Sequence, residues 1–383
     1  MKDRVGIIGI GWSGFQPTSP GLSYKEMIYH AASRAYNDAC IDPRRDVDSF
    51  ITLAEDFNEG TSIFDEYTPD QIGAALKPVH TITGDGIHGL STAMMLILTG
   101  QSNVVVVEAH SKASNIITEP FINAYAQDPI HNRPLRLSSY FIAGMEMTRY
   151  LYETGTSSEQ CAAVVVKNRA NALNNPSAPY GGYFTLSEIL SGESIAYPLS
   201  IHECAHFSDG AIVLVIASEK YALALSPHPI WILGIGWCND SPALESRNWG
   251  QLPYVTRSAQ MAFRQAGINN PLSAIDFAEV DDLFAYKELQ TLEALGFFQP
   301  GEAGALTLEG FTNLSGEFPV NVSGCCLGGG NLLDANGLAR VLEVVLQLRG
   351  EAGSRQIQDA EIGLAQSWRG LPTTSCAVTI LGG

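Results

Sequence analysis

The sequence predicts an α/β protein made of two related halves. The tetrapeptide Gly-Ile-Gly-Trp occurs twice, at Gly9–Trp12 and Gly234–Trp237, and each copy ends a short apolar strand. Each copy is followed by a helical pattern and a second strand, so a strand–helix–strand unit recurs after about 225 residues, as in an internal duplication. Strands that alternate with helices imply parallel strands joined by helical crossovers. A duplicated unit also favours a ligand pocket between its halves.

The first half alternates strands and helices until it is interrupted. Strands are predicted at 5–10, 48–54, 78–82 and 103–109, and helices at 24–40, 69–76 and 86–100. The run 104–107 is apolar at consecutive positions, which is typical of a strand buried on both faces. Residues 110–205 then hold helices near 140–154 and 158–172 and a loop rich in Asn, Pro and Gly at 174–182. We interpret this segment as an insertion that covers one end of the sheet.

The second half repeats the order of the first. A strand at 211–217 returns to the core, and strands at 229–235 and 276–281 and helices at 253–267, 285–295 and near 308–312 follow. A Gly-rich stretch at 323–337, a helix at 332–349 and strands near 361–365 and 376–381 complete the chain. The predicted domains are an N-terminal half, 1–225, with the insertion at about 110–205, and a C-terminal half, 226–383.

Composition narrows the class of partner. A net charge of −18 argues against nucleic acid and against an anionic membrane surface. No apolar run approaches the roughly 20 residues of a membrane span, and the N-terminus shows no signal-peptide pattern. Seven cysteines without a CxxC pair predict a reduced, cytoplasmic protein. Lys167 and Arg169 could hold an anionic ligand, although a solvated helix face is the simpler interpretation.

Two corners of the repeated unit could carry chemistry. Thr83, Asp85 and His88 lie where a strand ends and a helix begins, and a helix N-terminus favours negative charge. The alternative is that Asp85 is a helix cap and His88 a packed residue. Asn331 follows three glycines and occupies the equivalent corner of the second half. Glycines there allow close approach to a ligand or simply a tight turn.

Two further clusters could supply reactive or metal-binding side chains. Asp281 and Asp282 end a predicted strand, where a buried carboxylate would have a raised pKa and could act as a base. Asp282 could instead cap the next helix. His202, Cys204 and His206 could share one strand face as zinc ligands, but no fourth ligand is near in the sequence.

Five phrases resemble the thiolase superfamily, in particular its sterol-carrier-protein-x or lipid-transfer branch. They are Val165–Arg169, Ser208–Ala211, Pro319–Gly324, Gln347–Ala352 and Val378–Gly382, and the likeness spans nearly the whole chain. The resemblance implies a duplicated thiolase fold. It comprises two βαβ-type halves, mixed and mostly parallel sheets in five layers (αβαβα), and an inserted loop domain.

The same resemblance implies that the family's catalytic side chains are replaced. Thr83 stands at the position of the nucleophilic cysteine, and Asn331 and Asp281 stand at the positions of two histidines. The late phrase with the acid/base group becomes Gln366–Gly370. The predicted catalytic residues are therefore Asp281, Asn331, Thr83, Ser367, Gln366 and His88. The predicted contacts to coenzyme A, as part of the substrate, are Asp85, Gly86, Ser323, Gly324 and Gly330.

Three functions stay open. The first is retro-aldol cleavage of a β-hydroxyacyl-CoA without a cysteine acyl-enzyme, in which Asp281 is the base and Asn331 with backbone N–H groups near Gly86 holds the enolate oxygen. The second is a non-catalytic subunit that binds acyl-CoA or a partner enzyme. The third is an acyltransferase of changed mechanism, with direct transfer or transfer through Cys325 or Cys326. The resemblance implies a homodimer and a small zinc-ribbon/OB-fold partner, with no permanently bound cofactor and no metal.

Overall fold

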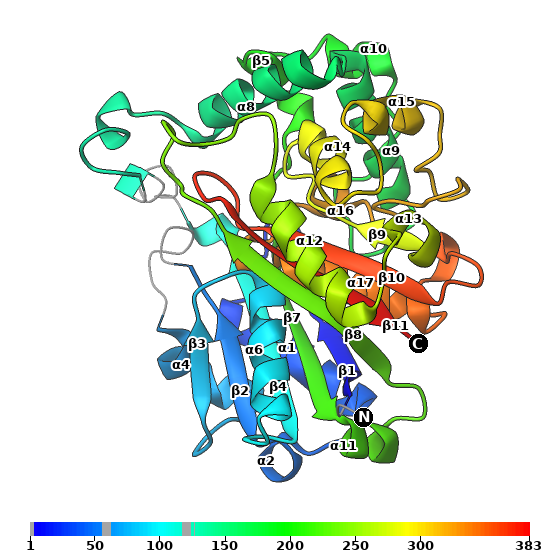
Figure 1. Ribbon diagram of the computed structural model, residues 1–383. Coiled ribbons are helices and arrows are strands. Elements are labelled where there is room, and N and C mark those ends of the chain that lie inside the picture. The colour runs from blue at the N-terminus through cyan, green and yellow to red at the C-terminus, as the bar shows by residue number, and fades with distance from the viewer. Residues whose placement is uncertain (1–3, 56–62, 117–123, 126) are drawn as a thin grey trace.

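The computed structural model describes residues 4–55, 63–116, 124–125 and 127–383, and its centre is a nine-stranded sheet (Figure 1). The strand order is β3-β2-β4-β7-β1-β8-β11-β10-β9. The strands are β1 (Val5–Trp12), β2 (Ser49–Leu53), β3 (Val79–Ile82), β4 (Val104–Lys112), β7 (Asp209–Ser218), β8 (Ile230–Asn239), β9 (Phe277–Glu279), β10 (Ile362–Trp368) and β11 (Ser375–Gly382), and β5 (Ser194–Ala196) and β6 (Leu199–Ser200) form a separate pair.

Helices pack on both faces of the sheet and at one end of it. The α-helices are α1 (Tyr24–Asp38), α2 (Pro43–Asp46), α4 (Phe64–Tyr67), α5 (Pro69–Ile72), α6 (Gly86–Leu98), α8 (Ser139–Thr154), α9 (Ser158–Ala172), α10 (Leu186–Leu190), α11 (Glu219–Leu225), α12 (Pro253–Ala266), α13 (Pro271–Ala274), α14 (Ala285–Ala294), α15 (Glu302–Leu308), α16 (Cys325–Gly329) and α17 (Asn336–Leu348). Short 3₁₀ turns lie at Ala113–Asn115, Arg133–Leu135, Ile201–Glu203, Leu333–Ala335 and Gly353–Arg355. Among the described residues, no helix is long and apolar enough to cross a membrane.

The strand pairing has the symmetry of a duplication. From the central contact of β1 with β8, the pairs run antiparallel, antiparallel and parallel in both directions, through β7, β4 and β2 on one side and β11, β10 and β9 on the other. The outermost strand, β3, has its counterpart in a parallel bridge between Ala278 and Val320. The sheet is mixed, as predicted, but the strand–helix alternation indicated only the parallel outer pairs and not the antiparallel central ones. The domain boundaries at 225 and 226 stay a prediction.

The two Gly-Ile-Gly-Trp copies allow a helix to lie directly on each central strand. A Cβ built on Gly9 would stand 2.6 Å from the carbonyl oxygen of Ala35 in α1, and one on Gly11 would overlap that of Ala31. In the second copy, Cβ atoms on Gly234 and Gly236 would overlap backbone carbonyls of α12. Because glycine alone permits such an approach, the repeat encodes the same strand–helix contact twice.

The layers follow the predicted αβαβα order. α1 packs on the outer face of the first half-sheet and α12 on the outer face of the second, while α6 and α17 lie together between the half-sheets. Along β4, Val105 and Val107 belong to the central apolar cluster, and Val104 and Val106 face α1. Strand residues that alternate between two apolar layers explain the continuous hydrophobic run.

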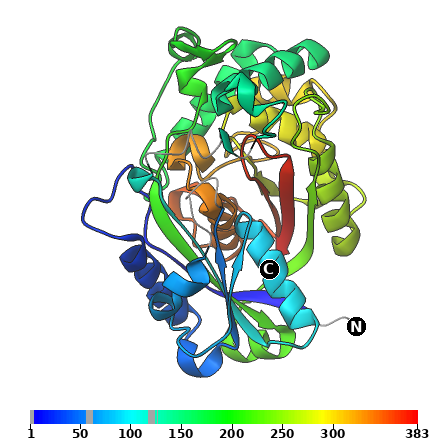
Figure 2. The ribbon, with the colours of Figure 1, turned by 90° about the vertical axis from the view of Figure 1, so that its left-hand side faces the viewer.

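The helices of the insertion, α8 to α10, lie at one end of the molecule (Figures 1 and 2). α9 packs against α14, α15 and α16 of the second half. The expectation of a solvated Lys167 and Arg169 is wrong, since both are buried. Lys167 Nζ lies 2.8 Å from Glu288 Oε1, and Arg169 donates to the carbonyl of Tyr180. These residues hold the insertion in place because a buried cation needs such partners.

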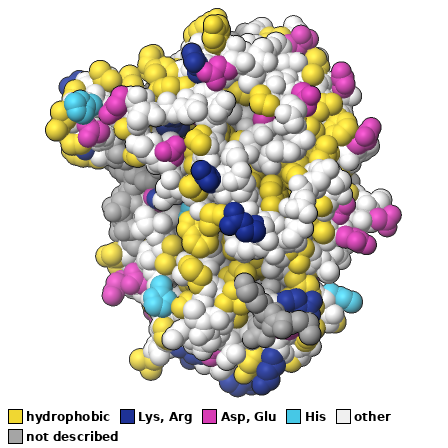
Figure 3. Space-filling view, viewed as in Figure 1, with side chains coloured by type: hydrophobic (Ala, Val, Ile, Leu, Met, Phe, Trp, Pro, Cys, Tyr) yellow, Lys and Arg dark blue, Asp and Glu magenta, His cyan; other side chains and the backbone are white. Residues whose placement is uncertain are grey.

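On the face shown in Figure 3, Lys and Arg side chains are spread among acidic and hydrophobic ones.

We predict that Gly11→Ala and Gly236→Ala each lower the free energy of unfolding by about 1–3 kcal/mol, because the added methyl group forces a helix away from its strand. Denaturant unfolding followed by circular dichroism measures the effect. Gly21→Ala is the matched control, since a Cβ there would meet no atom within 4 Å. If Gly236→Ala unfolded at the same denaturant concentration as the parent chain, the close contact would not be needed.

Candidate functional site

A largely apolar cavity of about 230 Å³ lies at the starts of α6 and α17. Hydrophobic side chains form most of its wall, and its polar side chains include Asp85, Ser138, Ser139, Asn331, Asp334, Asn336 and Arg369. The apolar wall is made of Leu137, Tyr140, Ala205, Phe207, Leu283, Phe284, Leu333, Trp368 and Leu371. An apolar pocket with a few convergent polar groups is the form that small-molecule sites usually take.

Asp85 lies between the starts of the two central helices. Its carboxylate accepts a hydrogen bond from the Ile87 N–H at 3.1 Å, which caps α6, and another from the Gly337 N–H at 2.8 Å, in the first turn of α17. The residue is 2% exposed. Burial raises the pKa of Asp85 to about 6, although the Ser367 hydroxyl and the charge of Arg340 hold it down. The Ser367 hydroxyl lies close enough to Asp85 to lower its pKa, but its orientation does not give a regular hydrogen bond.

Two glycines bring these helices together. A Cβ on Gly86 would overlap the backbone nitrogen of Leu338, and one on Gly337 would overlap the Asp85 carboxylate. α6 and α17 therefore begin almost backbone to backbone, and the Asp85 carboxylate fills the gap between them. Gly86 has a packing function here, and its predicted contact to coenzyme A stays a prediction.

Asn331 lies on the wall of the same cavity, so the two corners predicted from the repeat do meet. Its side-chain oxygen accepts from the Leu333 N–H at 2.9 Å and from Asn336 Nδ2 at 2.7 Å. These bonds fix the orientation of the amide. Within the part of the chain that the structure describes, its Nδ2 has no hydrogen-bond partner and is available as a donor to a ligand.

The other residues predicted at the first corner do not line the cavity. Thr83 is exposed, and its catalytic role stays a prediction. His88 is buried, and its Nε2 lies 3.4 Å from Ser375 Oγ. Burial and the nearby Arg369 charge lower the pKa of His88 to about 4, so the ring is neutral at neutral pH. Gln366 and Ser367 are fully buried, and Gln366 Oε1 accepts a hydrogen bond from the Asp281 N–H.

Asp281 lies behind the cavity wall in a buried ion pair. Its Oδ2 is 2.8 Å from Arg340 Nη2, and its Oδ1 accepts from the Leu283 N–H at 3.0 Å. Both partners are almost fully buried. A carboxylate bound to a guanidinium in this way is better placed to hold Arg340 than to take a proton from a ligand.

Asp282 caps α16, and the expectation that it caps the next helix, α14, is wrong. Its two oxygens accept from the N–H groups of Cys326, at 2.7 Å, and Leu327, at 3.1 Å, while Phe284 is the N-cap of α14. Burial, together with the charge of Glu288, raises the pKa of Asp282 to about 6. The strand end points toward a helix distant in the sequence, so the nearest downstream helix was the wrong partner.

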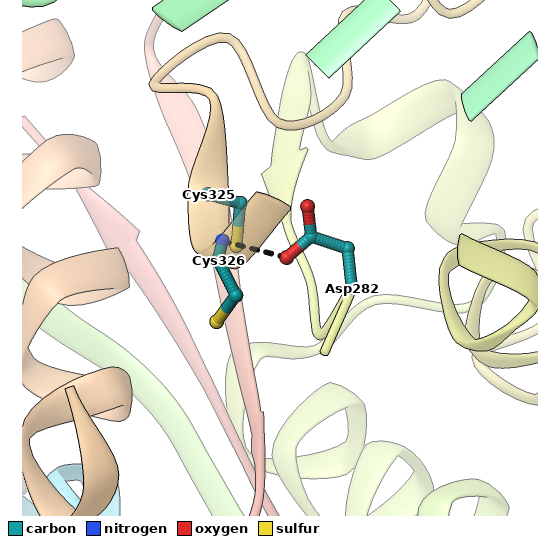
Figure 4. Close-up of side chains that lie close together, drawn as sticks. All are labelled: Asp282, Cys325 and Cys326. Carbon is teal, nitrogen blue, oxygen red and sulfur yellow. Dashed lines mark hydrogen bonds between the residues drawn. The ribbon is translucent and has the colours of Figure 1, made fainter. Parts of the chain in front are cut away.

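Asp282, Cys325 and Cys326 form a group of three potential metal ligands (Figure 4). Arg340 donates to both sulfur atoms, from Nε to Cys325 at 3.3 Å and from Nη2 to Cys326 at 3.1 Å. A guanidinium cation at this place opposes the binding of a metal cation. Burial raises the pKa of the Cys325 thiol. Both cysteines line a separate, smaller cavity of about 40 Å³ and not the larger one.

The remaining residues predicted to contact coenzyme A lie near these cysteines. Ser323 Oγ donates to Glu279 Oε2 at 2.5 Å, and Ser323 and Gly330 line the smaller cavity. Gly324 packs against Ala172 of α9. Their observed contacts are internal to the protein, and a ligand-binding function stays a prediction.

Among the side chains that were not singled out from the sequence are Asp334, Asn336, Arg340, Trp368 and Arg369. Arg340 is a charged residue within the apolar pattern of α17. This break in the pattern is the sequence signal that could have indicated a buried ion pair. Trp368 and Arg369 lay within a phrase already noted, but no sequence pattern shows that they face the cavity. Arg369 pairs with Glu55 at the cavity edge, and Lys287 Nζ lies 4.3 Å from the Trp368 ring centroid.

Comparison with known sequences relates this chain to thiolases. A family model described as thiolase C-terminal domain-like matches residues 238–383. Acetyl-CoA acetyltransferase of Methanothermobacter thermautotrophicus is 29% identical over 98% of both chains. Sterol carrier protein 2 of Rattus norvegicus is 31% identical over 94% of this chain and 69% of its own length.

Solved structures of thiolase-like proteins are similar to this chain over nearly its whole length. The Ltp2-ChsH2(DUF35) aldolase superposes with a TM-score of 0.84 at 26% identity and covers 99% of this chain and 98% of its own. Human mitochondrial 3-ketoacyl-CoA thiolase, with a TM-score of 0.74 at 15% identity over 100% of this chain and 99% of its own, shares the fold. Fold and site thus define a thiolase-fold protein related to proteins that act on acyl-CoA. The chain belongs to the sterol carrier protein 2 thiolase branch of the thiolase superfamily.

We predict that Asp281→Ala lowers the free energy of unfolding by about 3–5 kcal/mol, because it leaves the buried Arg340 guanidinium without its carboxylate. Denaturant unfolding measures this loss. Glu153→Ala, which breaks the more exposed pair with Arg149, is the control and should cost far less. A loss for Asp281→Ala no larger than the loss for the control would show that the ion pair does not stabilise this region.

Proposed function

We propose that this protein cleaves a carbon–carbon bond of a β-hydroxyacyl-CoA by retro-aldol chemistry, without a cysteine acyl-enzyme. One observation carries the proposal. A buried carboxylate, Asp85, and a donor amide, Asn331, lie on one apolar cavity, and no cysteine is among the described residues that line it. This set of groups suits proton transfer and stabilisation of an oxyanion more than nucleophilic attack.

The chemistry of the two reactions differs in what it needs from the protein. An acyl-enzyme requires a thiolate or an activated hydroxyl beside the thioester carbonyl. Thr83 stands at the position of the family's cysteine, but it is exposed and lies off the cavity wall. Retro-aldol cleavage requires a base for the β-hydroxyl proton and a donor for the enolate oxygen. We assign the second function to Asn331 Nδ2.

The structural relative whose title names an aldolase supports this choice, since it is similar over nearly all of both chains. That title also names a second component, ChsH2(DUF35). We propose that this chain likewise works with a small zinc-ribbon/OB-fold partner and that coenzyme A enters as part of the substrate. The homodimer and the cytoplasmic location stay predictions from the sequence.

Acyl transfer is the second candidate, because relatives over nearly the full length are named acetyl-CoA acetyltransferases. In this chain it would need direct transfer or a thiol. The candidates that the sequence suggests are Cys325 and Cys326, which line the smaller cavity. Their burial disfavours the thiolate that would attack a thioester.

The test of the aldolase proposal is product analysis. The chain, alone and with a zinc-ribbon/OB-fold partner, is incubated with β-hydroxyacyl-CoA thioesters of different chain length. We expect a released ketone or aldehyde together with a shortened acyl-CoA in equal amounts, and none from saturated acyl-CoA thioesters that lack the hydroxyl group. Binding of the thioester without either product, with and without the partner, would instead favour a non-catalytic subunit.

A mass measurement separates acyl transfer from retro-aldol cleavage. After incubation with acetyl-CoA, we expect the intact chain to keep its mass, because the pKa of the Cys325 thiol is raised and the thiol is protonated at neutral pH. Cys40, which is exposed, is the internal control for nonspecific acetylation. A stable adduct at Cys325 or Cys326, lost in the corresponding Cys→Ser variant, would establish the acyltransferase instead.

A further inference from the structure

We propose that Asp85 is the catalytic residue that moves the proton in both directions, taking it from the β-hydroxyl group and returning it to the α-carbon of the product. This inference rests on the proposed function and names the base of the same cavity. It replaces Asp281, which the sequence suggested for that step.

The position of the carboxylate is the first argument. Asp85 lines the 230 Å³ cavity, whereas Asp281 and Asp282 lie behind its wall and are held by Arg340 and by α16. Asp334 is the other carboxylate on the cavity, and its Oδ2 accepts from the Glu55 N–H at 2.8 Å. Of the two, Asp85 lies where the helices from both halves begin, the place at which the duplicated unit is expected to hold its ligand.

The hydrogen bonding of Asp85 leaves room for a substrate proton. A carboxylate offers about four lone-pair sites. One oxygen accepts from Ile87 and the other from Gly337, which leaves acceptor sites for the nearby Ser367 hydroxyl and for a substrate proton. The two backbone donors lock the orientation of the group without protonating it. A fixed carboxylate with free acceptor sites in an apolar cavity meets the geometric requirement for a general base.

The charges that face Asp85 from each packed element allow it to gain and lose a proton near neutrality. Arg340 of α17 lowers its pKa, and desolvation raises it to about 6. On α6, His88 is neutral, because burial lowers the pKa of its ring to about 4. From β11, the Cys376 thiol is neutral, because burial raises its pKa to about 12. Arg369 after β10 and Asp334 complete the charged groups on the cavity wall. A base that titrates near the working pH can both accept and return a proton.

In the proposed reaction, the same residue, Asp85, accepts a proton in the first step and returns it in the last. Asp85 accepts the β-hydroxyl proton as the Cα–Cβ bond breaks, and the bonding pair moves into the thioester carbonyl to give an enolate. The β-carbon leaves as a ketone or an aldehyde. Protonated Asp85 gives its proton to Cα, the carbonyl re-forms, and a shortened acyl-CoA is released. No external oxidant, reductant or nucleophile is used.

The test compares two reactions in Asp85→Asn. Asparagine removes the base and keeps one acceptor oxygen for the cap of α6, while its amide nitrogen replaces the oxygen that accepts from the Gly337 N–H. Circular dichroism and denaturant unfolding of Asp85→Asn check that the variant is folded before the two reactions are compared. The first reaction is cleavage of β-hydroxyacyl-CoA. The second is exchange of the α-protons of a saturated acyl-CoA with D₂O, followed by NMR, which needs the base and the enolate donor but no bond cleavage. We expect Asp85→Asn to lose about 10²–10⁴-fold in both. Asp128→Asn is the matched control, because Asp128 also accepts from two backbone N–H groups but is exposed and off the cavity.

The pH dependence adds an independent readout. Cleavage by the parent chain should fall about tenfold per pH unit below the pKa of its base, because only the ionised carboxylate accepts a proton. Asp282 also titrates near 6, so the limb is assigned by its disappearance in Asp85→Asn and not by its value. Persistence of this limb in the residual activity of Asp85→Asn would overturn the assignment.

The outcomes separate the two proposals. Cleavage that survives in Asp85→Asn and is lost in Asp334→Asn overturns the assignment of Asp85 and keeps the aldolase. Exchange that depends on Asp85, in a chain that cleaves no β-hydroxyacyl-CoA with or without its partner, supports Asp85 as the proton carrier and overturns the aldolase. Absence of both reactions in the parent chain overturns both proposals.

Discussion

Direct contact between backbones, made possible by glycine, is the constraint on which the rest of this structure depends. It occurs first where Gly9 and Gly11, and again Gly234 and Gly236, let α1 and α12 lie on the central strands. It occurs again where Gly86 and Gly337 let α6 and α17 start side by side. Each contact fixes a helix axis relative to the sheet without an intervening side chain. The second also fixes the position of a polar group, because the Asp85 carboxylate accepts backbone N–H groups from the starts of both helices.

The buried charges form a second level that depends on the first. Arg340 lies on α17, and the position of α17 carries the guanidinium to Asp281, Cys325 and Cys326. A guanidinium has five donors in a fixed plane, so one residue can orient groups from the end of β9 and from α16 together. The sulfur atoms of both cysteines therefore accept hydrogen bonds from Arg340, and neither cysteine lines the larger cavity. Both cysteines lie in the first turn of α16 and line the smaller cavity, so they are close in sequence to the Gly-rich corner but absent from the wall of the larger cavity.

Most of the fold, and a part of the candidate site, could be predicted from the sequence. The repeat of Gly-Ile-Gly-Trp predicted the duplication, since backbone contacts leave a mark that is local and specific. The sequence also indicated Thr83 and Asn331 as equivalent corners of the duplicated unit, and of these Asn331 lies on the cavity, together with Asp85 of the first corner, whereas Thr83 does not. The partners of Asp281, Asp282 and Lys167 could not be found in this way. Each is bound by a residue more than 40 positions away, and the choice between a cap, an ion pair and a free base depends on that partner.

Thr83 stands at the position of the family's thiol, and a carboxylate, Asp85, lies between the paired helix starts. Helix N-termini stabilise a negative charge, and here the protein supplies that charge itself through Asp85. A thioester oxyanion would be repelled from a place already occupied by a carboxylate, so stabilisation by these N–H groups is not available to an acyl-enzyme. The enolate oxygen needs another donor, and Asn331 Nδ2 is one whose carbonyl is already fixed by Leu333 and Asn336. In the retro-aldol step proposed above, the base held by the helices takes the proton, and the donor held by the Gly-rich corner stabilises the negative charge that moves to the enolate oxygen.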